Sequence, residues 1–277
     1  MSEWDLKYEP FKSYDQMLEE LRRRPNNRFM RNEHDSDKHG RSEWYGTNSL
    51  AEAYKLLGEG YVAAVKKMKT SVEKQIKANA GKLEVVNHAR PSNAVVGYIP
   101  NVPNALRGLP QSMITVNIKP MKKKTLHILY AMGGSCSEDR SYFENAGIAL
   151  LSAVDLIEKS GIQTKIDLSY YCGKIGNEVC MPSITIKNYG ERYSVQKVSF
   201  PLAHTAMLRR IGFKWLETFP DMGRDFSGGY GTPMKAYEIE EVCKQIKEPN
   251  THVISTAWIN NNKCEVEEIM KKLGVTE

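Results

Sequence analysis

One strand–helix–strand stretch constrains the fold most. Leu126–Met132 is an apolar run typical of a buried strand, and Gly133-Gly134 ends it. A helix is then indicated by a capping box at Ser141-Tyr-Phe-Glu144 and by apolar residues at helical spacing. Gly161 ends that helix, and Gln163–Cys172 resumes as a strand. A unit of this size predicts a right-handed parallel crossover.

The rest of the chain adds further elements around this unit. Strands are predicted at Met113–Ile118, Pro182–Lys187 and Val253–Ala257, and helices at Leu202–Phe219, Tyr237–Ile246 and Val266–Leu273. Strands that alternate with helices are typical of an α/β fold. We therefore predict a mixed sheet with crossover helices.

The N-terminal part is predicted to be helical and basic. Ser13 can cap a short helix, and Ser49-Leu-Ala-Glu52 is a capping box for a helix that ends near Leu57. A second, lysine-rich helix is predicted over Tyr61–Ala78, whereas prolines leave only one strand, at Ala94–Ile99, in the segment that follows. These signals predict three parts: an N-terminal arm over 1–48, a helical and loop region over 49–110, and an α/β core over 111–277.

Bulk composition excludes several classes of protein. No apolar run among the 277 residues approaches the length of a membrane span, and the N-terminal residues lack the apolar core of a signal peptide. The five cysteines are scattered and form no C-x-x-C pair, which argues against a disulfide framework and a structural zinc site. We expect a soluble cytoplasmic protein without a membrane partner.

Charge is distributed unevenly along the chain. Between Glu84 and Glu138 there is no Asp or Glu, although six Lys and Arg residues fall in this gap, and the net charge is +6. An exposed surface built from this stretch would attract polyanions. The alternative is that much of the stretch is buried sheet, where acids are scarce for another reason.

Cationic and aromatic side chains in several segments could form a nucleic-acid interface. Single-stranded nucleic acid is held by cationic grooves with aromatic faces on which bases stack. Each cluster alone is also compatible with an ordinary solvated surface. The candidate binding residues are Arg22, Arg23, Arg24, Arg28, Arg31, Lys66, Lys67, Lys69, Arg90, Arg107, Lys122, Lys123, Lys124, Tyr45 and Tyr98.

The loop Gly133-Gly-Ser-Cys-Ser137 follows a buried strand, where α/β folds often bind phosphates. It lacks the residues of a P-loop and of a dinucleotide fingerprint, so a plain turn is the alternative. It resembles the metal-site loop of von Willebrand factor A domains, Asp-x-Ser-x-Ser. Ser135 and Ser137 match the serines, but Gly133 replaces the aspartate. The resemblance therefore implies a degenerate von Willebrand A-like architecture over about 124–275, without a metal.

No catalytic or cofactor site is predicted. Ser135, His204 and Asp167 could be combined into a hydrolytic triad, but no nucleophile-elbow motif supports it. The metal-capable segment His34–His39 is polar and contains a lysine, so we interpret it as a solvated loop. We therefore expect no cofactor and no metal.

Four short motifs resemble a family of bacteriophage proteins that is mostly without assigned function. The motifs are Trp44-Tyr-Gly46, Ser49-Leu-Ala-Glu-Ala53, Gly97-Tyr-Ile-Pro-Asn-Val-Pro103 and Met207-Leu-Arg-Arg-Ile-Gly-Phe213. The chain is also similar to the single-stranded-DNA-binding RNA polymerase cofactors of lytic podophages. That resemblance implies binding at melted promoters, recruitment of a phage RNA polymerase, a homo-oligomer, and action in the cytoplasm of an infected host cell.

The leading hypothesis is thus a non-catalytic protein that binds single-stranded DNA in phage transcription or replication. A protein–protein adaptor on a degenerate von Willebrand A-like scaffold is the second hypothesis. An enzyme that uses the 133–137 loop for a phosphorylated ligand is the third.

Overall fold

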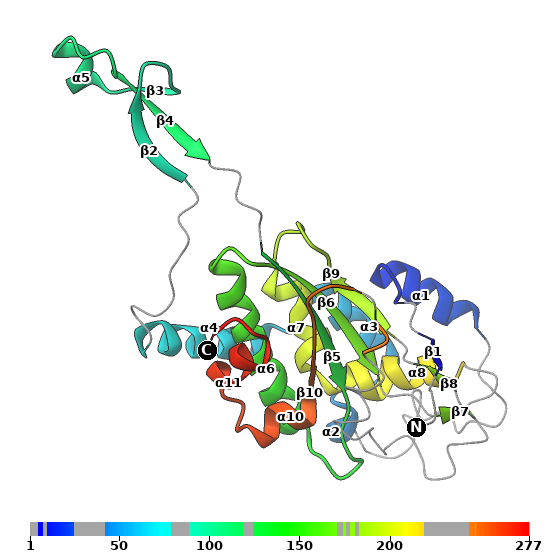
Figure 1. Cartoon of the computed structure of the whole chain (residues 1–277). Coiled ribbons are helices and arrows are strands. Elements are labelled where there is room, and N and C mark those ends of the chain that lie inside the picture. The colour runs from blue at the N-terminus through cyan, green and yellow to red at the C-terminus, as the bar shows by residue number, and fades with distance from the viewer. Residues whose placement is uncertain are drawn as a thin grey trace.

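The computed structural model has a body built on a four-stranded sheet, and a smaller three-stranded sheet lies apart from it (Figure 1). The structure describes residues 5–7, 10–24, 42–78, 89–118, 124–170, 174–175, 178–180, 183–218, 244–246 and 248–276. Among the helices of these residues, none combines the length and the apolar character needed to cross a membrane.

The central sheet has the strand order β10-β5-β6-β9. Its strands are β5 (Thr125–Met132), β6 (Gln163–Tyr170), β9 (Ser183–Lys187) and β10 (Thr251–Ser255). β10, β5 and β6 run parallel, and β9 is antiparallel to β6. Helix α6 (Arg140–Lys159) connects β5 to β6, which confirms the predicted parallel unit and the α/β class with a mixed sheet.

The two faces of this sheet differ in chemistry. Ile128 and Tyr130 of β5 and Leu168 of β6 belong to the apolar core, together with residues of α6, of α4 (Val62–Ala78) and of α7 (Val195–Ala203). Because side chains alternate along a strand, the intervening residues point to the opposite face. That face carries His127 and Asp167, both fully buried. A buried ionisable pair therefore joins β5, whose sequence is otherwise mostly apolar, to β6.

The N-terminal helices begin where their caps predict. α1 (Tyr14–Arg23) starts after Ser13, whose hydroxyl accepts from the Gln16 N–H, and α3 (Leu50–Glu59) starts after Ser49, whose hydroxyl accepts from the Glu52 N–H. The short α2 (Ser42–Tyr45) precedes α3, and α4 (Val62–Ala78) follows it. The helices predicted from Ser49 and over 61–78 are thus confirmed.

The predicted cap of α6 is wrong. Asp139 caps the helix instead of Ser141, because its carboxylate accepts from the Tyr142 N–H at 3.1 Å and from the Ser141 hydroxyl at 2.6 Å. Glu144 does not reach back to the helix start. Its carboxylate forms an ion pair of 2.5 Å with Lys67 of α4, and so it joins two helices.

The long helix predicted over 202–219 is divided into three elements: α7 (Val195–Ala203), the π-helical η2 (Met207–Gly212) and α8 (Phe213–Leu216). The break falls at His204, whose backbone is extended. A π-helical turn widens the backbone spiral and is frequent at functional sites. Apolar periodicity alone could not have revealed this turn.

At the C-terminus, β10 and α11 (Val266–Lys272) confirm the predicted strand and last helix. The helix α10 (Thr256–Asn261), which follows β10 directly, was not predicted. Most of the helix predicted at 237–246, including residues 237–243, lies outside the described residues.

A separate antiparallel sheet is formed by residues 89–118, which we call the arm. Its strands are β2 (Ala89–Ala94), β3 (Ile99–Pro100) and β4 (Met113–Ile118), in the order β2-β4-β3, with the short helix α5 (Val102–Leu106) between β3 and β4. The predicted division at 110/111 falls inside this sheet, and β4 belongs to the arm rather than to the central sheet. A third small sheet pairs β1 (Asp5–Lys7), β8 (Glu178–Cys180) and β7 (Lys174–Ile175).

Candidate functional site

Two arginines of the π-helix η2 are the largest fully buried side chains among the described residues. Arg209 is 2% exposed, and its guanidinium lies 4.1 Å from the centre of the Trp44 ring and 4.9 Å from that of Phe143. It donates hydrogen bonds to the carbonyl oxygens of Trp44 (2.7 Å), Glu138 (2.7 Å) and Ser135 (3.4 Å). A guanidinium has five N–H donors in a planar fork, which suits this set of acceptors.

The second arginine binds the next part of the same segment. The Arg210 guanidinium lies 4.1 Å from the centre of the Tyr45 ring and donates to the Thr47 carbonyl oxygen at 3.0 Å. Tyr45 is only 1% exposed, so the prediction that its ring stacks on bases is wrong. Between the two contacts, Gly46 has a φ of +78°, and a Cβ there would lie 2.3 Å from the Thr205 hydroxyl.

Arg209 also places a positive charge beside the 133–137 loop. Its guanidinium holds the Ser135 carbonyl, and Trp44 Nε1 donates to the Cys136 carbonyl at 2.8 Å. Burial lowers the pKa of Arg209 to about 10, so the group stays protonated at neutral pH. A fixed positive charge beside the loop disfavours a divalent cation there. This agrees with Gly133 in place of an aspartate.

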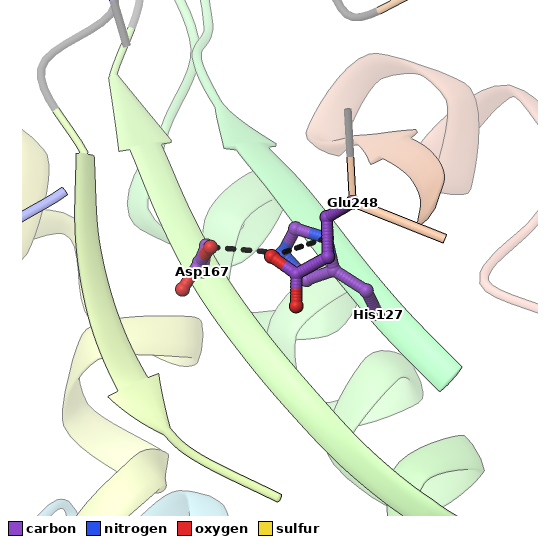
Figure 2. A group of neighbouring side chains, drawn as sticks. All are labelled: His127, Asp167 and Glu248. Carbon is purple, nitrogen blue, oxygen red and sulfur yellow. Dashed lines mark hydrogen bonds and ion pairs between the residues drawn. The ribbon is translucent and has the colours of Figure 1, made fainter. Parts of the chain in front are cut away.

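Figure 2 shows three ionisable side chains, His127, Asp167 and Glu248, that meet on the polar face of the sheet, and Lys165 lies beside them. His127 Nε2 lies 2.8 Å from Asp167 Oδ2, and His127 Nδ1 lies 3.5 Å from Glu248 Oε2. Lys165 Nζ lies 2.5 Å from the Glu248 carboxylate and 3.4 Å from that of Asp167. The potential ligand atoms of His127, Asp167 and Glu248 all lie within 4.8 Å of one another.

Imidazole and carboxylates of this kind can bind zinc, but the arrangement favours a structural role. The Lys165 ammonium occupies the position of the cation, because it contacts both carboxylates. His127 and Lys165 also lie near the amino ends of β5 and β6, whereas α/β sheets bind ligands at the carboxyl ends. The cluster therefore links β5, β6 and the segment before β10.

The arginines predicted at the end of α1 are engaged within the protein. Arg23 pairs with Glu19, and Arg24 pairs with Glu20 at 3.4 Å, each one turn away on the same helix. Arg22 lies 6.0 Å from the centre of the Tyr54 ring. The two glutamates therefore offset two of the three positive charges at this helix end.

The lysines of α4 differ from one another. Lys67 pairs with Glu144, whereas Lys66 and Lys69 are exposed and form no ion pair with any described residue. Figure 1 places α1 and α4 at opposite ends of the body, so the structure does not bring these two cationic clusters together.

The remaining candidates are divided between the arm and the residues around it. Arg107 is exposed, Tyr98 is 87% exposed, and Arg90 lies in β2 opposite Asn117. Lys124 is exposed directly before β5. The predictions for Arg28, Arg31, Lys122 and Lys123 fall outside the described residues.

Sequence reasoning missed the buried arginine pair and the His127–Asp167 contact. Two adjacent arginines inside the apolar stretch 207–213 were a usable signal, because a charge placed among core residues needs buried partners. His127 interrupts a strand that was predicted to be buried, and Asp167 lies in the next predicted strand. Their register across β5 and β6 could not be known before the sheet order was known.

The fold and these contacts define an α/β protein with a clamped 133–138 loop and a projecting arm. The chain belongs to the family described as "Domain of unknown function (DUF7192)", whose model matches residues 6–277. No curated protein and no solved structure matches it.

Proposed function

We propose that the protein is a non-catalytic binder of single-stranded nucleic acid, with phosphates held by exposed cations of α4, of the arm and of the residue before β5. One observation carries the proposal: these cations are exposed and lack an ion-pair partner among the described residues. They are Lys66, Lys69, Arg107 and Lys124. The sequence from 85 to 137 contains no acid that could neutralise Arg107 or Lys124 locally.

Binding of this kind is driven by the release of counterions from the phosphate chain. For single strands, the logarithm of the association constant falls with the logarithm of salt concentration, with a slope of about −0.7 for each phosphate neutralised. Exposed lysines suit this role because they approach phosphates as mobile point charges. The resemblance to phage proteins favours a role in transcription or replication in an infected cell, with a phage RNA polymerase as partner.

A salt titration with a labelled single-stranded oligonucleotide tests the proposal. We expect Lys66→Ala with Lys69→Ala to weaken binding roughly 10-fold at low salt and to reduce the slope by about 1.4. The matched control is Arg23→Ala with Arg24→Ala, which removes the same charge from ion-paired residues on α1 and leaves affinity unchanged. Absence of binding, or binding that does not respond to salt, would sink the proposal.

The second candidate function is a protein–protein adaptor on a von Willebrand A-like scaffold. Numbered along the chain, the central strands lie in the order third, second, first, fourth, which matches the first four positions of a doubly wound order. The 133–137 loop follows the first of these strands, and Arg209 beside it favours a surface without a metal. A complex with a phage RNA polymerase that survives nuclease digestion supports the adaptor, whereas a complex bridged by nucleic acid dissociates.

A further inference from the structure

The arm carries almost all the exposed large apolar side chains of the described chain. Of eight such residues, only Val62 lies in the body. The other seven belong to the arm and are exposed by 45% to 87% of their surface: Val95, Val96, Tyr98, Ile99, Val102, Leu106 and Leu109. Single exposed apolar residues are normal on a surface, but seven of them within residues 95–109 indicate an interaction site.

The arm has no apolar interior of its own where its side chains are described. Between residues 92 and 115, no side chain is buried. A small antiparallel sheet needs a hydrophobic face packed against something to be stable in water. This segment therefore lacks its principal stabilising contribution as long as its apolar side chains face solvent.

Polar contacts nevertheless fix the shape of the arm. The Asn101 side chain donates to Asn93 Oδ1 at 2.9 Å and accepts from the Asn104 N–H, so it joins β2 to the start of α5. The Asn104 side chain donates to the Gln111 carbonyl at 3.1 Å. At Gly97, a Cβ would lie 2.3 Å from the Ile114 carbonyl oxygen, so the chain can pass this close to β4 only with glycine. The apolar side chains are thus held outward by a preformed backbone.

The chemistry of this face favours a protein over a nucleic acid. Six of the seven side chains are aliphatic, and aliphatic groups offer no π-face on which bases can stack. Arg90 and Arg107 are the only charged residues between 89 and 118. Depletion of charge and enrichment of apolar groups are typical of the centre of a protein interface.

We propose that the arm is a self-association surface, and that a second copy of this chain covers its apolar face. At roughly 100–200 Å² for each fully exposed large side chain, the seven residues present about 800 Å², which is what one partner buries in a stable interface of standard size. A two-fold arrangement places this face on its own copy. Pro91 cannot donate from the edge strand β2, which disfavours extension of the sheet at that edge.

This surface lies outside the lysine surface of α4, and the inference does not depend on nucleic-acid binding. Sedimentation equilibrium of the full chain tests it with Val96→Asp combined with Leu106→Asp. The wild-type chain is expected to have a molar mass of twice 31.5 kDa, and the variant one of 31.5 kDa. The circular dichroism spectrum of the variant should be unchanged. The buried face would have to take up two charges in each copy, so dimerisation should weaken more than about 100-fold.

Val62→Asp is the control, because it places one such carboxylate at the one exposed large apolar residue of the described body. It should leave the dimer intact. A wild-type monomer at every concentration overturns the proposal, and so does a dimer that Val96→Asp with Leu106→Asp leaves unchanged. Loss of oligonucleotide affinity in that variant, with a monomeric wild type, would instead assign the arm to nucleic acid.

A second measurement uses only the wild-type chain, so its result does not depend on whether a variant folds. Amide hydrogen exchange of the wild-type chain, followed over a roughly 100-fold range of protein concentration, should show protection of residues 92–115 that increases with concentration, because association is a mass-action process. Protection that is independent of concentration overturns the proposal. Whether the α4 lysines bind oligonucleotide is read separately from the salt titration, so failure of one proposal is distinguishable from failure of the other.

Discussion

The Arg209 guanidinium lies 4.1 Å from the centre of the Trp44 ring and also donates to the carbonyl oxygen of Trp44 at 2.7 Å. The same side chain thus contacts both the face of the ring and the backbone that carries it. Two of the four motifs that distinguish the sequence, around residues 44–46 and 207–213, are therefore the two sides of one contact. This explains why neither motif suggests a reaction.

Replacement of Arg209 should strongly destabilise the protein. Arg209→Met leaves the carbonyls of Trp44 and Glu138 without their donor, and we expect the free energy of unfolding to fall by about 3–5 kcal/mol. Arg209→Lys keeps the charge but loses the planar fork, so it should recover only part of this. Urea unfolding measures both. Arg192→Met, at an exposed position, is the control, with an expected change below about 0.5 kcal/mol. A similar value for Arg209→Met would contradict a structural role.

Gly46→Ala should destabilise the protein for two separable reasons. Gly46 has a φ of +78°, and its added Cβ would lie 2.3 Å from Thr205 Oγ1. Gly190 has a φ of +76° with nothing near its Cβ position. Gly190→Ala should therefore lower the free energy of unfolding only through its positive φ, by about 1 kcal/mol. Gly46→Ala adds the contact with Thr205 and should lower it by about 2–4 kcal/mol. Calorimetric melting midpoints compare them directly, and equal shifts would mean that the packing against Thr205 is loose.

Local signals of the sequence predicted what depends on near neighbours. Ser13 and Ser49 cap their helices because each hydroxyl accepts an N–H three residues ahead, a contact that the chain makes wherever the helix lies. The same reasoning failed at Ser141, because Glu144 is bound by Lys67, 77 residues away. The apolar face of the arm was missed for a related reason. Apolar spacing predicts which residues prefer burial, but not whether the fold supplies a partner for them.

Acid should destabilise the protein through His204. Burial, together with the charge of Arg140, lowers the pKa of His204 to about 3, and the Ala206 N–H donates to its Nδ1 at 3.1 Å. In the unfolded chain the His204 imidazole binds a proton with the ordinary pKa of about 6.5. The free energy of unfolding is therefore unaffected by His204 above that pH and falls progressively as the pH is lowered toward 3. At pH 5 the loss should be about 2 kcal/mol. His204→Asn keeps an acceptor and does not titrate. The difference between urea midpoints at pH 7 and pH 5 should therefore be smaller in this variant, and an equal difference would exclude His204 as the source.

Removal of the Lys165 ammonium should destabilise the protein far more than removal of a surface lysine. Lys165 lies between the Asp167 and Glu248 carboxylates, and Asp167 is fully buried. Lys165→Met therefore leaves two negative charges close together with one compensating group fewer, and a loss of about 3–5 kcal/mol is expected. The control is Lys159→Met, because Lys159 pairs with Asp155 at 2.6 Å but is 56% exposed, where such a pair contributes less than about 1 kcal/mol. Urea unfolding at neutral pH measures both variants.

If the cluster were instead a metal site that the lysine merely borders, zinc would raise the melting midpoint of the wild-type chain and Lys165→Met would strengthen that effect. If the lysine is the internal cation, zinc leaves the wild-type midpoint unchanged.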